Sequence, residues 1–298
     1  MSGAAGQGTR MRRRLLRLAT GLILRLPPAL QPAGIHAYHW LTFVARHRRW
    51  PRKPASGFNN YLYALKTGGA LAHALRRRVT DKALGKRYID RLLGRGHTVP
   101  TLAVLDSPEA IAAFSPAAFP VVLKPTHSSG RLVICQDAGA LQAAQPLLLG
   151  WLVHDYYRET LESNYAGLAR RVIAEPYIDK AFYLEGSIHC RNGRARIISV
   201  IDRFDVQKRR ASLTSDWRHL HVALGQPYQA LDMAQPAYLG ALLEAAETVS
   251  AAFDYIRVDF YASDSGFLLG ELTNLPGGAL ARFSSRDGEH RFNRAFLA

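Results

Sequence analysis

Acidic residues are absent from the first 80 positions of this 298-residue chain. That stretch holds 15 of the 39 Lys and Arg residues, whereas the remaining 218 residues hold 24 basic and 23 acidic ones. The formal net charge of +16 therefore belongs almost entirely to the beginning of the chain. The rest is balanced as in an ordinary soluble enzyme, so an anionic partner is expected to contact the basic head first.

Several motifs that carry a known chemistry are also missing. The only two cysteines, Cys135 and Cys190, form no CxxC pair, and the eleven histidines include no HExxH pattern. A disulfide framework and a zinc site are therefore not indicated, and a reducing, cytoplasmic compartment is expected. There is no GxxxxGK[ST] motif either, which argues against a P-loop nucleotide site.

The basic head contains one Leu-rich stretch, residues 15–26, which Arg17 and Arg25 interrupt. It is too short and too charged to span a bilayer, which takes about 20 apolar residues. One interpretation is a helix lying on an anionic surface, such as the inner face of the membrane or a glycan. A helix packed on the domain, a disordered segment and a cleaved signal peptide are the alternatives.

Beyond the head, helical and strand patterns alternate along the chain. Helical patterns, including one capped at Thr80 or Asp81 and one that starts at Ser107, cover most of 36–78, 81–93, the stretch from 107, 138–153 and 232–253. Strand patterns cover 102–105, 119–124, 132–135, 171–178, 182–190, 194–202, 256–261 and 267–273. Turn residues at 191–193 and 263–266 predict two hairpins, so we expect an α+β fold with antiparallel strands.

The last predicted hairpin, within "YIRVDFYASDSGFLLGELTNLPGG", gathers charged residues on one face. Side chains alternate along a strand, so Arg257 and Asp259 share a face with Glu271 and Thr273. A three-residue turn at 264–266 would place Asp259 opposite Glu271, with Cβ atoms about 5 Å apart. The sequence thus predicts a pair of facing carboxylates.

Two carboxylates this close raise each other's pKa unless a cation lies between them. An all-oxygen site favours Mg²⁺, which keeps part of its water and shares a substrate phosphate. Arg257, beside the pair, is placed to bind a phosphate oxygen. The alternative is a solvent-exposed sheet face that carries an ordinary Arg–carboxylate salt bridge.

A second candidate site lies upstream, in "FPVVLKPTHSSGR" at 119–131. An apolar strand ends on Lys124, and a turn of small residues, 126–130, leads into the next apolar strand. Small loop residues let backbone N–H groups approach phosphate oxygens. Lys124 by itself could equally be an exposed lysine at a strand end.

The motifs resemble a known family when they are taken in order. They are Asp81-Lys82 with Lys86, "FPVVLKP…SSG", "RRVIAEPYI", "LEGSIHCRNG", "YIRVDFY" and "GELTNLPGG". Together they resemble the ATP-grasp fold, in which two α+β lobes hold ATP between them. The stretches 151–178 and 202–217 are similar to the TupA-like ATP-grasp proteins, which are linked to bacterial cell-surface polysaccharide. The resemblance covers residues 80–290.

This resemblance implies an ATP- and Mg²⁺-dependent carboxylate–amine ligase, which forms an acylphosphate that an amine then converts to an amide. It assigns catalytic roles to Lys124 and Arg257. It places Mg²⁺ on Asp259 and Glu271, with Thr273 where many ATP-grasp enzymes carry Asn. It assigns the remaining contacts with ATP to Lys82, Lys86, His127, Ser128, Ser129, Gly130, Glu175, Pro176, Tyr177, Ile178 and Glu185.

Within these contacts, 127–130 would be a mobile loop over the phosphates, 175–178 the adenine-lining segment, and Glu185 the residue near the ribose. The implied organisation is a basic segment 1–35, a helical or α/β region 36–115, a first ATP-grasp lobe 116–180 and a second lobe 181–298. Ser128 stands where the subgroup would have glycine, and no full substrate domain precedes the lobes. Neither the acceptor nor the oligomeric state follows from the resemblance.

Four functions compete at this stage, the fourth being a protein that binds a nucleotide without catalysis. The first is the ligase, joining an amino acid or amine to a carboxylate of a cell-surface polysaccharide or its precursor. The second is a kinase of a sugar or lipid-linked glycan, since phosphoryl transfer needs mainly positioning and charge neutralisation. The third is nucleic-acid binding by the basic head, whose arginines and aromatic residues permit such contacts. The third leaves the acidic pair unexplained, so no nucleic-acid partner is expected.

Overall fold

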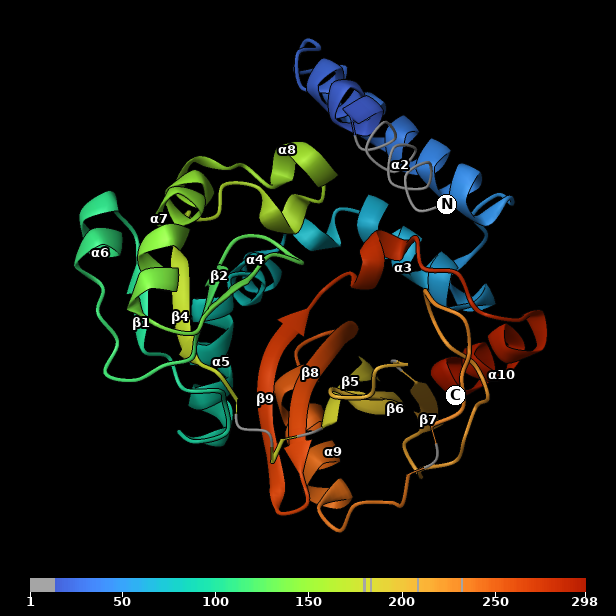
Figure 1. Ribbon diagram of the computed structural model, residues 1–298. Coiled ribbons are helices and arrows are strands. Elements are labelled where there is room, and N and C mark those ends of the chain that lie inside the picture. The colour runs from blue at the N-terminus through green and yellow to red at the C-terminus, as the bar shows by residue number, and fades with distance from the viewer. Residues whose placement is uncertain (1–13, 179–180, 183, 208, 232) are drawn as a thin grey trace, which may run out of the picture.

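The computed structural model describes residues 14–178, 181–182, 184–207, 209–231 and 233–298. It contains two antiparallel sheets, one of four strands and one of five, surrounded by helices (Figure 1). The predicted α+β class is therefore confirmed. None of the helices in the described part of the chain has the length and apolarity needed to cross a bilayer.

The basic head forms helices that pack onto the rest of the molecule. Residues 14–23 are helical, and they are followed by α2 (Gln31–His47), α3 (Phe58–Thr67), α4 (Ala74–Thr80) and α5 (Lys82–Leu93). Phe58 at the start of α3 is fully buried against Phe292 and Phe296 of α10 (Arg286–Leu297). Helices α3 and α10 thus share one apolar core beside the larger sheet.

The four-stranded sheet has the order β1-β4-β2-β3. Its elements are β1 (Ala103–Leu105), α6 (Pro108–Ala113), β2 (Val121–Pro125), β3 (Val133–Cys135), α7 (Ala138–Val153), α8 (Tyr157–Thr160) and β4 (Val172–Pro176). Helix α7 covers one face, where Leu148 and Trp151 pack into the core formed by Leu123 and its neighbours. Both cysteines are buried and free, Cys135 in this sheet and Cys190 in the other.

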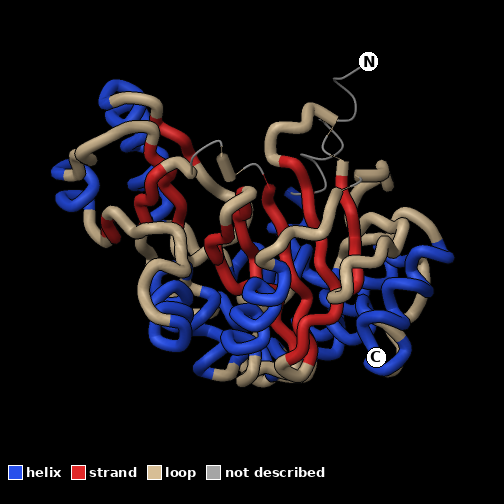
Figure 2. The backbone as a smooth tube through the Cα atoms, turned by 90° about the horizontal axis from the view of Figure 1, so that it is seen from below, coloured by secondary structure: helices blue, strands red, loops and turns tan. Residues whose placement is uncertain are grey.

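The five-stranded sheet has the order β7-β6-β5-β8-β9. Its strands are β5 (Leu184–Arg191), β6 (Arg194–Asp202), β7 (Arg210–Thr214), β8 (Tyr255–Ser263) and β9 (Gly266–Thr273). Helix α9 (Leu239–Ser250) buries Leu242, Ala246 and Val249 in the core with the apolar sheet face. In the second view most of the helices lie below the strands (Figure 2). The polar residues of β8 and β9 therefore lie on the face that α9 leaves uncovered.

Most of the predicted elements are confirmed. Asp81 caps α5 and Ser107 caps α6, each through a side-chain oxygen that accepts a backbone N–H. In the β5–β6 hairpin, Asn192 and Gly193 have φ values of 51° and 69°, the conformation that a type I′ turn needs. The helix predicted over 232–253 is shorter than expected and begins at Leu239, because Pro236 lacks a backbone N–H and restricts the residue before it.

The predicted three-residue turn between β8 and β9 is wrong, although the pairing it was meant to produce is right. Ser263 pairs with Gly266, so the turn has two residues, and by itself it would shift the register by one. An irregularity after Phe260↔Leu269 leaves Gly270 as an extra residue and restores Asp259↔Glu271. A β-bulge thus places the two carboxylates opposite each other.

Candidate active site

A cleft between the two sheets holds several of the predicted residues. One cavity of about 250 Å³ is lined by Lys82, Lys124, Gly130, Arg131, Leu132, Glu175, Glu185, Asp259, Phe260, Tyr261, Gly270 and Glu271. A neighbouring cavity of about 230 Å³ shares Lys124, Glu175 and Glu185 with it. That second cavity adds the apolar side chains Val122, Ile134, Pro176, Ile178 and Phe204, with Tyr177 and Arg203. A charged compartment therefore adjoins an apolar one.

Glu175 on β4 lies at the centre of the lysine cluster. Its side chain is 4% exposed, and its two carboxylate oxygens form ion pairs with Lys124, at 2.7 Å, and with Lys86. Lys124 lies on the neighbouring strand β2 and lines the cleft. Lys86 is buried behind Glu175 and also donates to the carbonyl of Val99, at 2.6 Å. The structure therefore brings Lys124 to the cavity and leaves Lys86 outside its lining.

The two lysines paired with Glu175 have opposite pKa shifts. Burial lowers the pKa of Lys86 despite its ion pair with Glu175. Burial acts on Lys124 in the same direction, but the field of Glu175, together with Tyr261 and Glu271, raises its pKa above the ordinary value. Lys124 is therefore held firmly in its charged form at the cleft.

The predicted phosphate loop is anchored over its first half. Thr126, His127 and Ser128 are buried, and Lys82 Nζ donates to the carbonyl of Ser128 at 2.6 Å. Burial lowers the pKa of His127, whose Nε2 lies 3.1 Å from the carbonyl oxygen of His154. Ser129 and Gly130 are exposed, and Gly130 has a φ of 69°. Of these loop residues only Gly130 lines the charged cavity.

Arg257, Asp259 and Thr273 form a compact group on β8 and β9. The Arg257 guanidinium donates two hydrogen bonds of 2.6 Å to Asp259, and the Thr273 hydroxyl donates to Asp259 at 3.1 Å. Burial raises the pKa of Asp259 to about 6, while Arg257 opposes that shift. Burial also acts to raise the pKa of Glu271, but Lys82, Arg257 and Lys124 outweigh it and lower that pKa. Only Asp259 therefore has a raised pKa, and burial, more than the field of Glu271, is the cause.

The donor set suits Mg²⁺ bound together with a phosphate. No group of three or more His, Cys, Asp or Glu side chains that could hold a metal occurs in the described part of the chain. An ionised aspartate offers about four acceptor positions, and Asp259 uses three of them. Glu271 faces it and, among the described residues, has Lys82 alone as an ion-pair partner, at 3.4 Å. Mg²⁺ is typically coordinated by one or two carboxylates together with water and phosphate oxygens, and this pair of carboxylates fits that pattern.

The neighbouring Asn274 turns away from this face. It is buried and donates to the carbonyl of Arg76 at 3.0 Å and to the Thr80 hydroxyl at 2.9 Å. Its side-chain oxygen accepts a hydrogen bond of 2.8 Å from Arg76. Thr273, not Asn274, is therefore the residue that accompanies Asp259 and Glu271.

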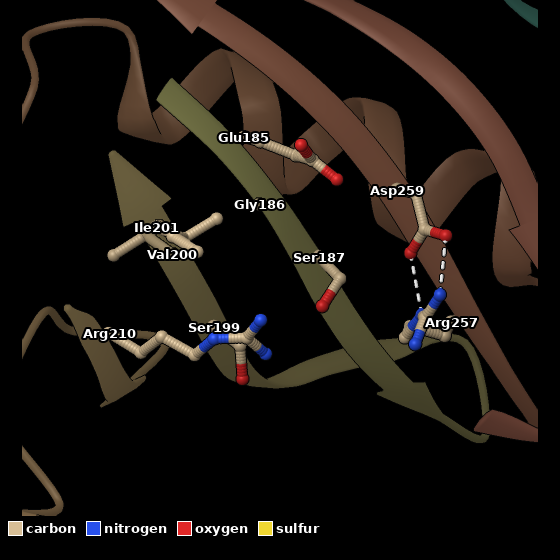
Figure 3. Close-up of a pocket in the computed structure, with 9 residues that line it drawn as sticks. All are labelled: Glu185, Gly186, Ser187, Ser199, Val200, Ile201, Arg210, Arg257 and Asp259. Carbon is tan, nitrogen blue, oxygen red and sulfur yellow. Dashed lines mark hydrogen bonds and ion pairs between the residues drawn. The ribbon is translucent and has the colours of Figure 1, made fainter. Parts of the chain in front are cut away.

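Sequence reasoning missed several residues that line the cleft. Tyr261, Arg131 and Leu132 line the charged cavity. Ser187, Ser199 and Arg210 line a third cavity that also contacts Asp259 and Arg257 (Figure 3). The alternation along β8 could have identified Tyr261, since it lies two residues beyond Asp259. Nothing in the sequence indicated Arg210, which joins the site only through the order of the strands.

Two antiparallel sheets that face each other across a cleft of lysines and paired carboxylates agree with the predicted ATP-grasp fold. Residues 68–295 match the family model of the TupA-like ATP-grasp proteins. The chain belongs to that family, and ATP and Mg²⁺, the predicted cofactors, agree with this membership. No curated protein matches the chain.

Several solved structures show a weak likeness. They include a D-alanine–D-alanine ligase from Bacillus anthracis complexed with ATP (20% identity, 67% of this chain and 57% of that one, TM-score 0.41). An L-amino acid ligase from Bacillus licheniformis matches at 15% identity (85% and 56%, TM-score 0.47), and a D-alanine–D-alanine ligase from Helicobacter pylori at 17% (68% and 53%, TM-score 0.40). The chain thus covers little more than half of their lengths, and we base the assignment on the family match alone.

Proposed function

We propose that the protein is an ATP- and Mg²⁺-dependent carboxylate–amine ligase that works through an acylphosphate. The observation that supports this most is the meeting of Lys124 with the Asp259–Glu271 pair in one cavity. These residues come from different sheets, and neither half would form a nucleotide site alone. Family membership supports the ligase class. Modification of a cell-surface polysaccharide or its precursor is the finer proposal, and it rests on the family resemblance.

The residues of the chain divide the work by charge and position. ATP would supply the phosphoryl group, and Mg²⁺ would neutralise charge on the phosphates. Lys124 and Lys82 present ammonium groups to the phosphate compartment, while Asp259 and Glu271 would hold the metal. Arg257, already fixed by Asp259, is placed to stabilise the phosphoryl group in transfer. Pro176, Tyr177 and Ile178 would line the adenine in the apolar compartment.

The nucleotide part of this proposal predicts that ATP with Mg²⁺ raises the melting temperature. A ligand that binds the folded state alone stabilises it by about 2.7 kcal/mol at one hundred times its Kd. Lys124→Ala should remove most of that shift, because the phosphates lose a charged contact. Lys53→Ala, which changes an exposed lysine in the loop before α3, should retain it. Absence of a shift in the unmodified protein would overturn the nucleotide site.

Substrate dependence separates the ligase from a kinase. A ligase should release ADP and phosphate only when a carboxylate and an amine are both present. Hydroxylamine replaces the unknown amine, since it converts an acylphosphate to a hydroxamate that ferric iron colours. ADP release with a phosphorylated hydroxyl product and no hydroxamate would favour the kinase.

We also propose that the N-terminal helix binds the inner face of an anionic membrane. Leu15, Leu18 and Leu22 lie at helical spacing and are 60%, 65% and 64% exposed. The exposed arginines Arg14 and Arg25 accompany them. An apolar stripe flanked by basic residues is typical of helices that lie in the lipid interface. This placement would leave the ligase peripheral and on the cytoplasmic side.

The exposed leucines should control binding to vesicles that contain phosphatidylglycerol. Leu18→Gln with Leu22→Gln is expected to weaken binding at least about tenfold, because each buried leucine contributes roughly 1.5–3 kcal/mol. Cosedimentation with vesicles measures the effect. Leu102→Gln, which changes a leucine 47% exposed just before β1, is the control and should bind as the unmodified protein does. Equal binding of all three proteins would contradict the membrane proposal.

A further inference from the structure

A row of polar side chains crosses the whole five-stranded sheet beside the acidic pair. The registers place Glu271 opposite Asp259, Asp259 opposite Ser187, and Ser187 opposite Ser199, and the row ends at Ser212 on β7. Directly paired residues point to the same face of a sheet. The carboxylates that would hold the metal are thus continued on the same face by three serines, of which Ser212 is buried.

A cavity of about 160 Å³ lies above this row. It is lined by Ser187 and Ser199 in its middle, by Arg257 and Asp259 at one end and by Arg210 at the other (Figure 3). Drug-sized ligands usually occupy roughly 300–1,000 Å³, so this cavity suits one small molecule that projects into the main cleft. It also contacts Glu185, which lines both other compartments.

The guanidinium of Arg210 forms no ion pair with a residue in the described part of the chain. It pairs in register with Ile201, and its side chain reaches over the sheet towards the two serines (Figure 3). Its Nε is buried and has no hydrogen-bond partner among the described residues. Burial lowers the pKa of Arg210, and the field of Glu185 only partly offsets that effect. A half-buried arginine in this state favours a bound anion.

We propose that this cavity binds the substrate whose carboxylate is phosphorylated, and that Arg210 holds a second anionic group on that substrate. This inference rests on the proposed function, because Arg257 and Asp259 mark the end where phosphoryl transfer would occur. Strand β7 lies three strands from β8, about 14 Å at the usual spacing of 4.7–4.9 Å. The Arg210 side chain covers part of that distance (Figure 3), so a chain of several carbons would separate the two anionic groups. The serine hydroxyls between them suit a hydroxylated carbon chain.

The chemistry takes place at one end of this substrate only. A carboxylate oxygen attacks the γ-phosphorus of ATP, the bond to the β–γ bridging oxygen breaks, and ADP leaves as the acylphosphate forms. The amine nitrogen then attacks the acyl carbon, and the bond between that carbon and the bridging phosphate oxygen breaks. Inorganic phosphate leaves, and the nitrogen loses a proton. Arg210 takes part in neither step. It orients the substrate and selects a second negative charge.

Three sugar acids with one carbon skeleton test the proposal. Gluconate, glucarate and 6-phosphogluconate differ at the far carbon, which carries a hydroxyl, a carboxylate or a phosphate ester. Their binding is measured by calorimetry on the full chain saturated with Mg²⁺ and a non-hydrolysable ATP analogue. At least one of the two acids with a second anionic group should bind about tenfold or more tightly than gluconate. Which one does so identifies the second group as a carboxylate or a phosphate.

Arg210→Gln should abolish this preference and leave the ATP-dependent thermal shift unchanged. Arg194→Gln removes an equal charge from an exposed side chain at the start of β6 and should keep the preference. Equal binding of all three acids, a preference that survives Arg210→Gln, or no binding of either doubly charged acid would overturn the inference. Each of these outcomes counts only if ATP still raises the melting temperature of the protein. Failure of the nucleotide site would instead abolish that rise, so the two failures can be told apart.

Discussion

Replacing Glu175 by glutamine should lower the free energy of unfolding by about 3–5 kcal/mol, the usual cost of removing one partner of a buried ion pair. The Glu175 side chain is 4% exposed and accepts from Lys86 and Lys124. Glutamine leaves both ammonium groups without a counter-ion, and Lys86, which is 3% exposed, cannot reach water. Denaturant unfolding without nucleotide, followed by circular dichroism, measures the loss.

Two further variants make that result specific. Lys124→Met should cost less, because Glu175 keeps Lys86 and the Lys124 side chain is already 19% exposed. Glu244→Gln, at an exposed position on α9, should leave the unfolding curve unchanged. A loss below about 1 kcal/mol for Glu175→Gln would mean that water reaches the lysines and that the cluster is not sealed.

Replacing Glu271 by glutamine should lower the maximal turnover on the order of 10²–10³-fold, the range seen when one electrostatic contact to a transition state is removed. Mg²⁺ would lose one of its two carboxylates, and Asp259 is already engaged by Arg257 and Thr273. Stability should hardly change, because the Glu271 side chain is 36% exposed and its ion pair with Lys82 is long, at 3.4 Å. Steady-state ADP release, repeated at raised Mg²⁺, measures the loss and its partial rescue.

The matched control is Glu244→Gln, an exposed glutamate on α9 outside the three cavities. It should retain the turnover of the unmodified protein. If the turnover of Glu271→Gln stayed within about threefold of that value, the metal site would be contradicted. The acidic pair would then belong to a solvent-exposed sheet face with an ordinary Arg–carboxylate salt bridge.

Local rules accounted for most of the elements. Caps at Asp81 and Ser107, the Asn192-Gly193 turn and the alternation along β8 each act within a few residues, so they can be found in the sequence. The same alternation placed Arg257, Asp259, Glu271 and Thr273 on one face. These rules fail where two local signals compete. At Pro236 the helical pattern of apolar residues continues, but the proline prevents a helix from running through it, and α9 begins only at Leu239.

The register of the last hairpin shows a compensation that no local rule supplied. The turn is one residue shorter than predicted, and the extra residue at Gly270 restores the pairing. A Cβ at position 270 would lie 3.2 Å from the Tyr261 ring, so glycine suits the close approach of the bulge to that side chain. The correct pair was therefore predicted from an incorrect turn.

By itself, the sequence determined the composition of the site: a strand-end lysine with a small-residue loop, two facing carboxylates with an arginine, and a basic head. Periodicity and turn chemistry suffice for these, because they act between residues close along the chain. Only the tertiary structure decided that Glu175 pairs with two lysines, that Lys86 lies behind it, and that Arg210 faces the same cavity as Asp259. Those pairs join residues 49 or more positions apart, and they depend on strand order and on which charges are buried together.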